Sequence, residues 1–224
     1  MKIFLDSAIK NEIVDVRSKG LVEGVTTNPK LVRKALEESR YDSLDGFFSE
    51  LLSISEGKFF IQVENKNKKK IVKQASRFAN LKSNRVVIKL PPSNAGLSSI
   101  PILSRRNIST CVTALFSPSQ AFVASKKGAD YVAFYYDRFV KSGGDGEKRL
   151  ERISKILDRT GKNTSIVVGS LKNPGQVSSS IIAGADIVTV PLKLLETLIS
   201  HKLSKKAFLQ FSGDWKNIKD ILER

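Results

Sequence analysis

The chain has 224 residues, of which 41% are hydrophobic, so it has enough apolar side chain for a core and is not expected to be disordered. Its 38 Lys and Arg residues outnumber its 22 Asp and Glu residues, and the net charge of +16 favours an anionic surface, a nucleic acid or a phosphorylated ligand as partner. One cysteine, Cys111, excludes an internal disulfide, and with a single histidine there is no recognisable zinc motif; we expect neither a metal nor a cofactor.

The beginning of the chain does not resemble a targeting segment. The sequence turns polar from Asp6 onward, after a short apolar run, which fits neither a signal peptide nor a targeting helix. No run approaches the roughly 18 apolar residues of a membrane span. We therefore expect a cytoplasmic protein that does not contact membrane.

Short runs of β-branched and aromatic residues recur along the chain and predict eight strands. The predicted strands are Lys2–Leu5, Leu21–Thr26, Lys58–Val63, Arg85–Leu90, Ile108–Ala114, Tyr131–Tyr136, Ser165–Gly169 and Asp186–Val190. Segments with helical spacing lie between them, namely Asn67–Ala79, Ser93–Leu103, Pro118–Lys127, Gly146–Leu157, Pro174–Ala183 and Leu192–Ser200. This alternation predicts parallel strands joined by right-handed crossovers.

Eight such units in roughly 200 to 250 residues are typical of a (β/α)8 TIM barrel, predicted here over residues 1–203. An open doubly wound sheet is the alternative, although no glycine-rich nucleotide-binding loop follows any strand. The segment Lys205–Glu223 has an apolar stripe of helical spacing. We therefore predict an additional C-terminal helix in residues 204–224, packed on the barrel or on a neighbouring subunit.

Polar side chains end many of the predicted strands, and in a barrel of this kind those ends form the active site. Lys89 follows three apolar residues and precedes Leu90, so its surroundings are apolar. Desolvation favours a neutral amine, which attacks ketones to form a Schiff base. The alternative is a lysine whose stem is buried at a strand end while its amine reaches solvent.

Other strand ends supply groups for proton transfer and binding. Asp6 is a candidate acid and base, and Gln62, Thr113 and Tyr135 are candidates for holding the water of Schiff-base chemistry. Asn28 is a candidate for binding substrate hydroxyls. Asp6 and Asn28 have structural alternatives, since each precedes a predicted helix or turn that it could cap.

A phosphate site is predicted on the loops after the sixth and seventh strands. Arg138 follows the sixth, and Ser170 and Lys172 precede the helix that begins near Pro174. Helix-start N–H groups opposite a guanidinium hold phosphate well. An ion pair of Arg138 with Asp137 or Asp145 is the alternative.

Several motifs together resemble the transaldolase family, in the short branch that includes the fructose-6-phosphate aldolases. The resemblance runs nearly end to end through FLDSA, GVTTNP, VVIKLP, TALFSPSQA, YVAFYYDR, GSLKNP, GADIVTVP and the closing DW. It implies a (β/α)8 barrel, a cofactor-free Schiff-base mechanism and sugar phosphate substrates. It also implies a homo-oligomer, which in small members is a decamer of two pentameric rings.

By this resemblance, Lys89 is the Schiff-base lysine and Asp6 the acid and base. Gln62, Thr113 and Tyr135 position the catalytic water. The remaining matches bind substrate, and they are Thr27, Asn28, Ala133, Arg138, Ser170 and Lys172.

Three positions favour the aldolase branch over transaldolase proper. Transaldolases proper carry Glu, Ser and Phe where this chain has Gln62, Ala133 and Tyr135. We therefore predict reversible cleavage of fructose 6-phosphate to dihydroxyacetone and glyceraldehyde 3-phosphate. Transaldolase proper, which transfers the dihydroxyacetone unit between sugar phosphates of the pentose phosphate pathway, is the near alternative.

An inactive basic barrel that binds nucleic acid or another polyanion is the alternative from a different class. The lysines are scattered and have no interleaved aromatic residues, so the sequence argues against nucleic acid as a partner.

Overall fold

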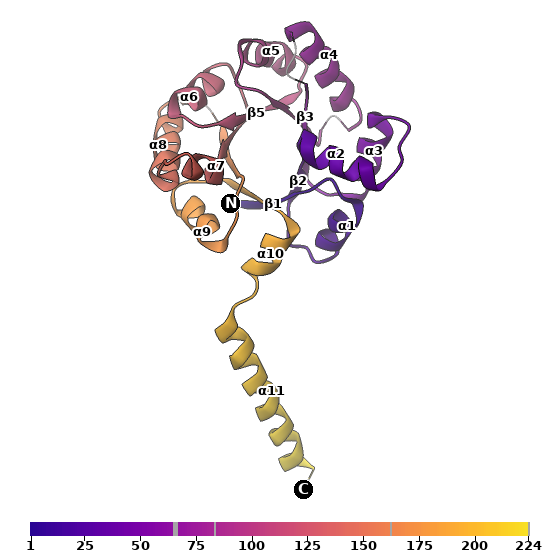
Figure 1. Ribbon diagram of the computed structural model, residues 1–224, viewed down its shortest axis with the longest axis vertical. Helices are drawn as coiled ribbons and strands as arrows, with labels where there is room; N and C mark the ends of the chain where they lie inside the picture. Colours follow the sequence, from indigo (N-terminus) through magenta and orange to yellow (C-terminus); the bar gives the residue numbers. More distant parts are fainter. Residues whose placement is uncertain (65–66, 83, 162, 224) are drawn as a thin grey trace.

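The computed structural model describes residues 1–64, 67–82, 84–161 and 163–223. Eight parallel strands pair in sequence order and close into a barrel, with helices around the outside (Figure 1). The predicted (β/α)8 barrel is confirmed, and the open doubly wound sheet is excluded. No helix within the described ranges is both long enough and apolar enough to cross a membrane.

The strands lie close to their predicted positions. They are β1 (Lys2–Asp6), β2 (Gly24–Thr26), β3 (Lys58–Gln62), β4 (Val86–Leu90), β5 (Ser109–Leu115), β6 (Tyr131–Tyr135), β7 (Ser165–Gly169) and β8 (Ile187–Val190). β2 is shorter than the predicted Leu21–Thr26 and begins at Gly24. At Gly24 a Cβ would lie 2.6 Å from the Lys58 carbonyl oxygen, so the close approach of β2 to β3 requires glycine.

The connecting helices include several that periodicity alone did not mark. They are α1 (Lys10–Ser18), α2 (Pro29–Glu38), α3 (Leu44–Ile54), α4 (Lys68–Ala79), α5 (Asn94–Ser104), α6 (Pro118–Lys126), α7 (Tyr136–Lys141), α8 (Gly146–Asp158), α9 (Pro174–Ile182), α10 (Leu192–Leu198) and α11 (Lys202–Leu222). The short helix α1 buries only Ile13 and Val16, and α7 buries only Tyr136 and Asp137, so neither has a long apolar stripe.

Two apolar layers hold the barrel together. The larger layer lies between the strands and the helices and includes Leu5, Ile88 and Val112. The smaller fills the barrel interior and comprises Phe4, Phe60, Val87, Cys111, Ala133, Val167 and Ile187. The Phe4 and Phe60 rings meet edge to face at 5.5 Å, so the barrel is packed and has no central pore.

α11 projects away from the barrel (Figure 1). None of its residues is buried, and Phe208, Phe211 and Trp215 are 60% exposed or more. The predicted C-terminal helix is therefore present, with its apolar stripe exposed to solvent in the single chain.

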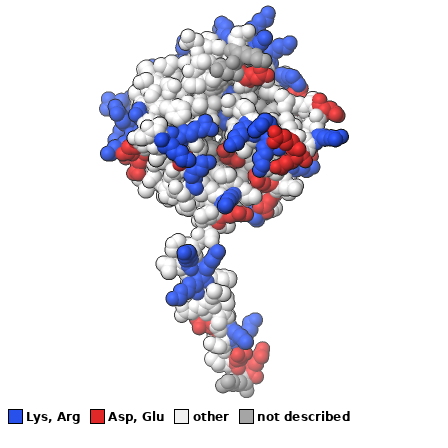
Figure 2. All heavy atoms as spheres, viewed as in Figure 1, with Lys and Arg blue, Asp and Glu red and all other residues white. Residues whose placement is uncertain are grey.

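Basic side chains are spread over the molecule. Figure 2 shows Lys and Arg interspersed with Asp and Glu on the visible face, and both signs also occur along α11. Ion pairs between exposed side chains, such as Arg33 with Glu37 and Lys34 with Glu38, account for part of this pattern.

Candidate active site

A cavity of about 240 Å³ opens at the carboxyl ends of the barrel strands. Five of the seven apolar residues of the interior layer are followed two positions later by a residue that lines the cavity, because side chains alternate along a strand. Phe4 leads to Asp6, Val87 to Lys89 and Ala133 to Tyr135 in this way. The lining residues are Asp6, Thr26, Asn28, Lys30, Leu31, Phe60, Lys89, Cys111, Ala133, Tyr135, Arg138, Val167, Gly169, Ser170, Leu171, Lys172, Thr189 and Pro191.

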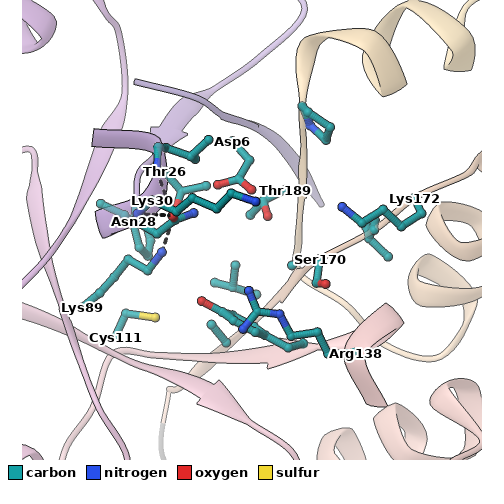
Figure 3. A pocket seen from close by; sticks show the side chains of 18 residues that line it. Asp6, Thr26, Asn28, Lys30, Lys89, Cys111, Arg138, Ser170, Lys172 and Thr189 are labelled. Atoms are coloured by element: carbon teal, nitrogen blue, oxygen red, sulfur yellow. Dashed lines mark hydrogen bonds between the residues drawn. The ribbon is translucent and has the colours of Figure 1, made fainter. Parts of the chain in front are cut away.

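Lys89 lies at the inner end of this cavity on β4, every residue of which is buried. It is 5% exposed, so its amine does not reach bulk solvent. Its Nζ donates to the Thr27 carbonyl oxygen at 2.6 Å and to the Thr26 hydroxyl at 3.2 Å. The amine is therefore held against the end of β2, inside the cavity (Figure 3).

Asp6 faces the same cavity from the end of β1. Burial raises the pKa of its carboxyl, and the positive charges of Lys89, Lys172 and Arg138 oppose that rise. A carboxyl whose pKa is raised takes up a proton more readily, which suits a group that acts as both acid and base. The helix-capping alternative does not hold, because α1 begins at Lys10 and its N-cap residue, Ile9, makes no side-chain cap bond.

Tyr135 and Thr113 are joined by a hydrogen bond of 3.1 Å, in which the Thr113 hydroxyl donates to the Tyr135 oxygen. The phenolic proton of Tyr135 then remains available to the cavity. The strands that carry these two residues, β5 and β6, change register between Val112 and Leu115, and Ala114 adopts a φ of 58° there. Such irregularities redirect strand side chains and are frequent beside active sites.

Cationic groups converge on the β6 and β7 side of the mouth. The guanidinium of Arg138 stacks over the Tyr135 ring at 4.7 Å. The ion-pair alternative for Arg138 is not found among the described residues, since Asp137 pairs with Lys141 and Asp145 with Lys148.

Ser170 and Lys172 lie beside Arg138 on the loop after β7 (Figure 3). Ser170 adopts φ of 66°, a left-handed conformation that costs a non-glycine residue about 1–2 kcal/mol. Strained backbone is concentrated at functional sites. The following helix, α9, is capped by Asn173, whose side chain accepts from the Gln176 N–H, so that donor is already occupied.

The structure does not bring every predicted site residue into the cavity. Thr27 is fully buried and donates its hydroxyl to the Phe60 carbonyl oxygen. Thr113 reaches the cavity only through Tyr135. Gln62 pairs in register with Lys89 but lines an adjacent apolar groove, bounded also by Val32 and Phe78.

Asn28 both caps a helix and lines the cavity, so its two candidate roles are compatible. Its side chain accepts from the Lys30 and Leu31 N–H groups at 3.1 Å and so caps α2, and the residue also lines the cavity.

Sequence reasoning missed three polar lining residues, Lys30, Cys111 and Thr189. Alternation from Ile187 could have revealed Thr189. Cys111 is fully buried below Lys89, and burial raises the pKa of its thiol to about 12. Lys30 lies beyond the strand end on α2, where no strand pattern applies.

No group of three or more His, Cys, Asp or Glu side chains is placed to hold a metal ion within the described part of the chain. The polar groups around the cavity include three lysine amines, one carboxyl, a phenol and a guanidinium. That set is suited to carbonyl addition and proton transfer on an anionic substrate.

Comparison with known proteins agrees with this chemistry. A family model described as "Transaldolase/Fructose-6-phosphate aldolase" matches residues 3–223. A "Probable transaldolase" of Coprothermobacter proteolyticus is 37% identical over 221 residues, covering 97% of this chain and 98% of the relative. A protein of the same description from Petrotoga mobilis is 37% identical over 225 residues, covering 100% of this chain and 98% of the relative.

A solved structure supports the fold alone. The structure titled "Crystal structure of a putative deoxyribose-phosphate aldolase from Coccidioides immitis" superposes with a TM-score of 0.58. It is 13% identical, and the match covers 88% of this chain and 83% of that one.

Proposed function

The chain belongs to the transaldolase/fructose-6-phosphate aldolase family and is an enzyme of the Schiff-base aldolase and transaldolase kind; from this premise we propose that Lys89 forms the Schiff base and that the main reaction is reversible cleavage of fructose 6-phosphate. The products are dihydroxyacetone and glyceraldehyde 3-phosphate. The observation that carries the proposal is the position of the Lys89 amine, which is 5% exposed and shares a cavity with Asp6 and Tyr135.

The first step is attack of the Lys89 amine on the C2 ketone, which forms a carbinolamine. Loss of water, with proton donation from the Tyr135 hydroxyl directly or through one water molecule, gives the iminium. Thr113 supports this role because its hydrogen bond to the Tyr135 oxygen orients the phenol. The adjacent Thr26 and Thr27 oxygens hold the Lys89 nitrogen in place before attack.

The second step breaks the C3–C4 bond. Asp6 takes the proton of the C4 hydroxyl, the bonding electrons move to the iminium nitrogen, and glyceraldehyde 3-phosphate leaves. The enamine that remains on Lys89 is protonated at C3 and hydrolysed by water, which releases dihydroxyacetone and restores the amine. The raised pKa of Asp6 supports this exchange of a proton in both directions.

The phosphate of the substrate is placed at the β6 and β7 side of the mouth. Arg138, Ser170 and Lys172 lie there together, across the cavity from the β2 end that holds Lys89. A guanidinium and an ammonium beside a hydroxyl match the geometry of a phosphate group.

Transaldolase proper is the second candidate, because the similar proteins from C. proteolyticus and Thermoplasma volcanium are both named "Probable transaldolase". In that reaction the enamine attacks an aldose phosphate such as erythrose 4-phosphate instead of being protonated. Tyr135 supports the aldolase, since a phenol beside the enamine supplies the proton that ends in free dihydroxyacetone.

The deciding experiment supplies fructose 6-phosphate with and without erythrose 4-phosphate and identifies the products. Release of dihydroxyacetone at a rate unaffected by the acceptor supports the aldolase. Sedoheptulose 7-phosphate formed much faster than free dihydroxyacetone decides for transaldolase.

Borohydride reduction tests the Schiff base itself. We expect a substrate adduct on Lys89 by peptide mass spectrometry, and none in Lys89→Met. Lys73→Met is the matched control, because Lys73 is exposed on α4 outside the cavity and its loss should change neither trapping nor turnover. Trapping and turnover retained by Lys89→Met would refute the proposal.

We also propose that α11 packs on a neighbouring subunit of a homo-oligomer, a decamer in the pattern of the small members that the chain resembles. The exposed stripe of Phe208, Phe211 and Trp215 supports this, because burying it would remove a large apolar surface from water. Light scattering should give a mass well above one chain. The double variant Phe211→Lys, Trp215→Lys should lower that mass, and a monomeric wild-type chain would contradict the proposal.

A further inference from the structure

A cation that the proposed reaction does not use faces the cavity. Lys30 lines it together with Lys89, Arg138 and Lys172, and Asp6 is the only carboxylate among the lining residues. The mouth is therefore more positive than binding one phosphate requires.

Lys30 lies on the opposite side of the mouth from the phosphate residues. It follows β2, while Arg138 follows β6 and Ser170 and Lys172 follow β7. In a barrel of eight strands paired in sequence order, β2 and β6 are diametrically opposed. Figure 3 shows the Lys30 side chain extending over the cavity from one side and that of Lys172 pointing in from the other.

The base of the Lys30 side chain is fixed, and its amine is uncommitted. Its backbone N–H donates to the Asn28 side chain, which caps α2. Further along the same helix Arg33 pairs with Glu37 and Lys34 with Glu38, whereas Lys30 has no ion-pair partner among the described residues.

The proposed reaction places the short end of a bound ketose on this side. Lys89, which holds the C2 carbon in the proposed reaction, has its amine against Thr26 and Thr27 at the end of β2. With the distal phosphate at Arg138 and Ser170, the C1 substituent extends from C2 toward β2, where Asn28 and Lys30 line the cavity.

The geometry points to Lys30 as a specificity residue that binds a second anionic group, carried on C1, so that the site accepts ketoses with an anion at each end. The inference rests on the proposed Schiff-base function. The chemistry is that of a phosphate or a carboxylate, since an ammonium recognises either as a point charge. Cleavage again breaks C3–C4 and releases glyceraldehyde 3-phosphate. The C1 to C3 fragment stays on Lys89 until water releases it.

The test compares three ketoses that differ at the C1 end. Fructose 6-phosphate has a neutral C1, fructose 1,6-bisphosphate has a phosphate there, and 2-keto-3-deoxy-6-phosphogluconate has a carboxylate there. For each, kcat/KM and borohydride trapping on Lys89 are measured in the wild type, Lys30→Ser and Lys30→Arg. Lys34→Ser is the matched control, because Lys34 lies one turn further along α2 and does not line the cavity.

We expect the wild type to trap and cleave at least one of the two ketoses that carry an anion at each end. Lys30→Ser should lower kcat/KM for that ketose about tenfold, the loss of one charge-assisted hydrogen bond, and change the value for fructose 6-phosphate less than about threefold. Lys30→Arg should retain most of the activity, and Lys34→Ser should match the wild type. Whichever of the two ketoses responds identifies phosphate or carboxylate as the second anion.

The failures are distinguishable. The second anion site is refuted, and the proposed function stands, in either of two cases. In the first, fructose 6-phosphate is trapped on Lys89 but neither ketose with an anion at both ends is trapped. In the second, Lys30→Ser lowers kcat/KM equally for all three substrates. If none of the three is trapped on Lys89, the proposed function is refuted and the second site with it.

Discussion

The guanidinium of Arg138 stacks 4.7 Å over the ring of Tyr135, and the oxygen of the same ring accepts a hydrogen bond from Thr113. The candidate phosphate ligand and the candidate proton donor therefore hold each other in position. A substrate phosphate bound by Arg138 would lie beside the phenol. This arrangement couples the position of the distal end of the sugar to the chemistry at C2.

Tyr135→Phe separates these two roles. The ring that Arg138 covers is kept, while the hydroxyl is lost, so the KM for fructose 6-phosphate should change little. Release of free dihydroxyacetone should fall about 100-fold, the lower end of the contribution of a positioned acid or base. Transfer to erythrose 4-phosphate should fall less, because the aldehyde replaces the proton as the electrophile; product analysis by mass spectrometry measures both.

The control for this variant is Tyr41→Phe, whose lost hydroxyl donates to Glu50 outside the cavity. It should leave both rates unchanged. Equal losses of cleavage and transfer in Tyr135→Phe would contradict a specific role of the phenol in protonating the enamine.

Asp6→Asn should stabilise the fold at neutral pH and abolish most of the activity. Burial raises the pKa of Asp6 from its usual 3.8, so the folded protein binds this proton more tightly than the unfolded chain does. The free energy of unfolding of the wild type therefore falls as pH rises from 3.8 to the raised pKa. Asp6→Asn does not lose this stability, because the asparagine side chain does not ionise. We expect a gain of about 1 kcal/mol at pH 7, as is common when a functional residue is replaced.

Urea unfolding of wild type and Asp6→Asn at several pH values measures this difference. The gain should shrink as pH falls toward 3.8 and vanish below it, where the carboxyl is protonated in both the folded and the unfolded protein. Asp42→Asn, at an exposed carboxylate, should change the free energy of unfolding by less than about 0.5 kcal/mol. A destabilised Asp6→Asn at pH 7 would show that the charges of Lys89, Lys172 and Arg138 outweigh burial.

Much of the site could be predicted from the sequence because the barrel strands obey a period of two. Lys89 follows Val87 on the inward face, and Asp6 follows Phe4 in the same way, so their convergence depends only on the strands being parallel and closed. The start of β2 was less predictable, since the requirement for glycine at Gly24 comes from a tertiary contact with the Lys58 backbone of β3.

The other features that the sequence did not reveal depend on geometry beyond strand alternation. The direction of Lys30 depends on how α2 leaves the end of β2. The position of Thr113 depends on the register shift at Ala114, where a non-glycine residue adopts a positive φ without any local sequence signal. Gln62 shares the register of Lys89 and yet lines the groove beside Phe78, because strand register does not determine which way a long side chain turns at the rim.

Cys111 should be inert in the folded protein, although it lies directly below Lys89 in the cavity. Burial raises the pKa of its thiol to about 12, and alkylation requires the thiolate. Iodoacetamide at pH 8 should leave the folded protein unmodified by mass spectrometry and should modify it fully in urea. Alkylation of the folded protein with loss of turnover would indicate that the cavity opens far more widely than the structure shows.

Ser170→Gly should raise the stability of the fold and weaken the binding of substrate. Ser170 adopts φ of 66°, which glycine reaches without the cost imposed by a Cβ, so the free energy of unfolding should rise by up to about 1 kcal/mol despite the added freedom of the unfolded chain. Loss of the hydroxyl beside Arg138 should raise the KM for fructose 6-phosphate about tenfold and leave kcat within about twofold. Asn107→Gly is the matched control, because Asn107 has φ of 56° outside the cavity and its replacement should affect stability alone. An unchanged KM in Ser170→Gly would show that the strained serine does not bind the phosphate.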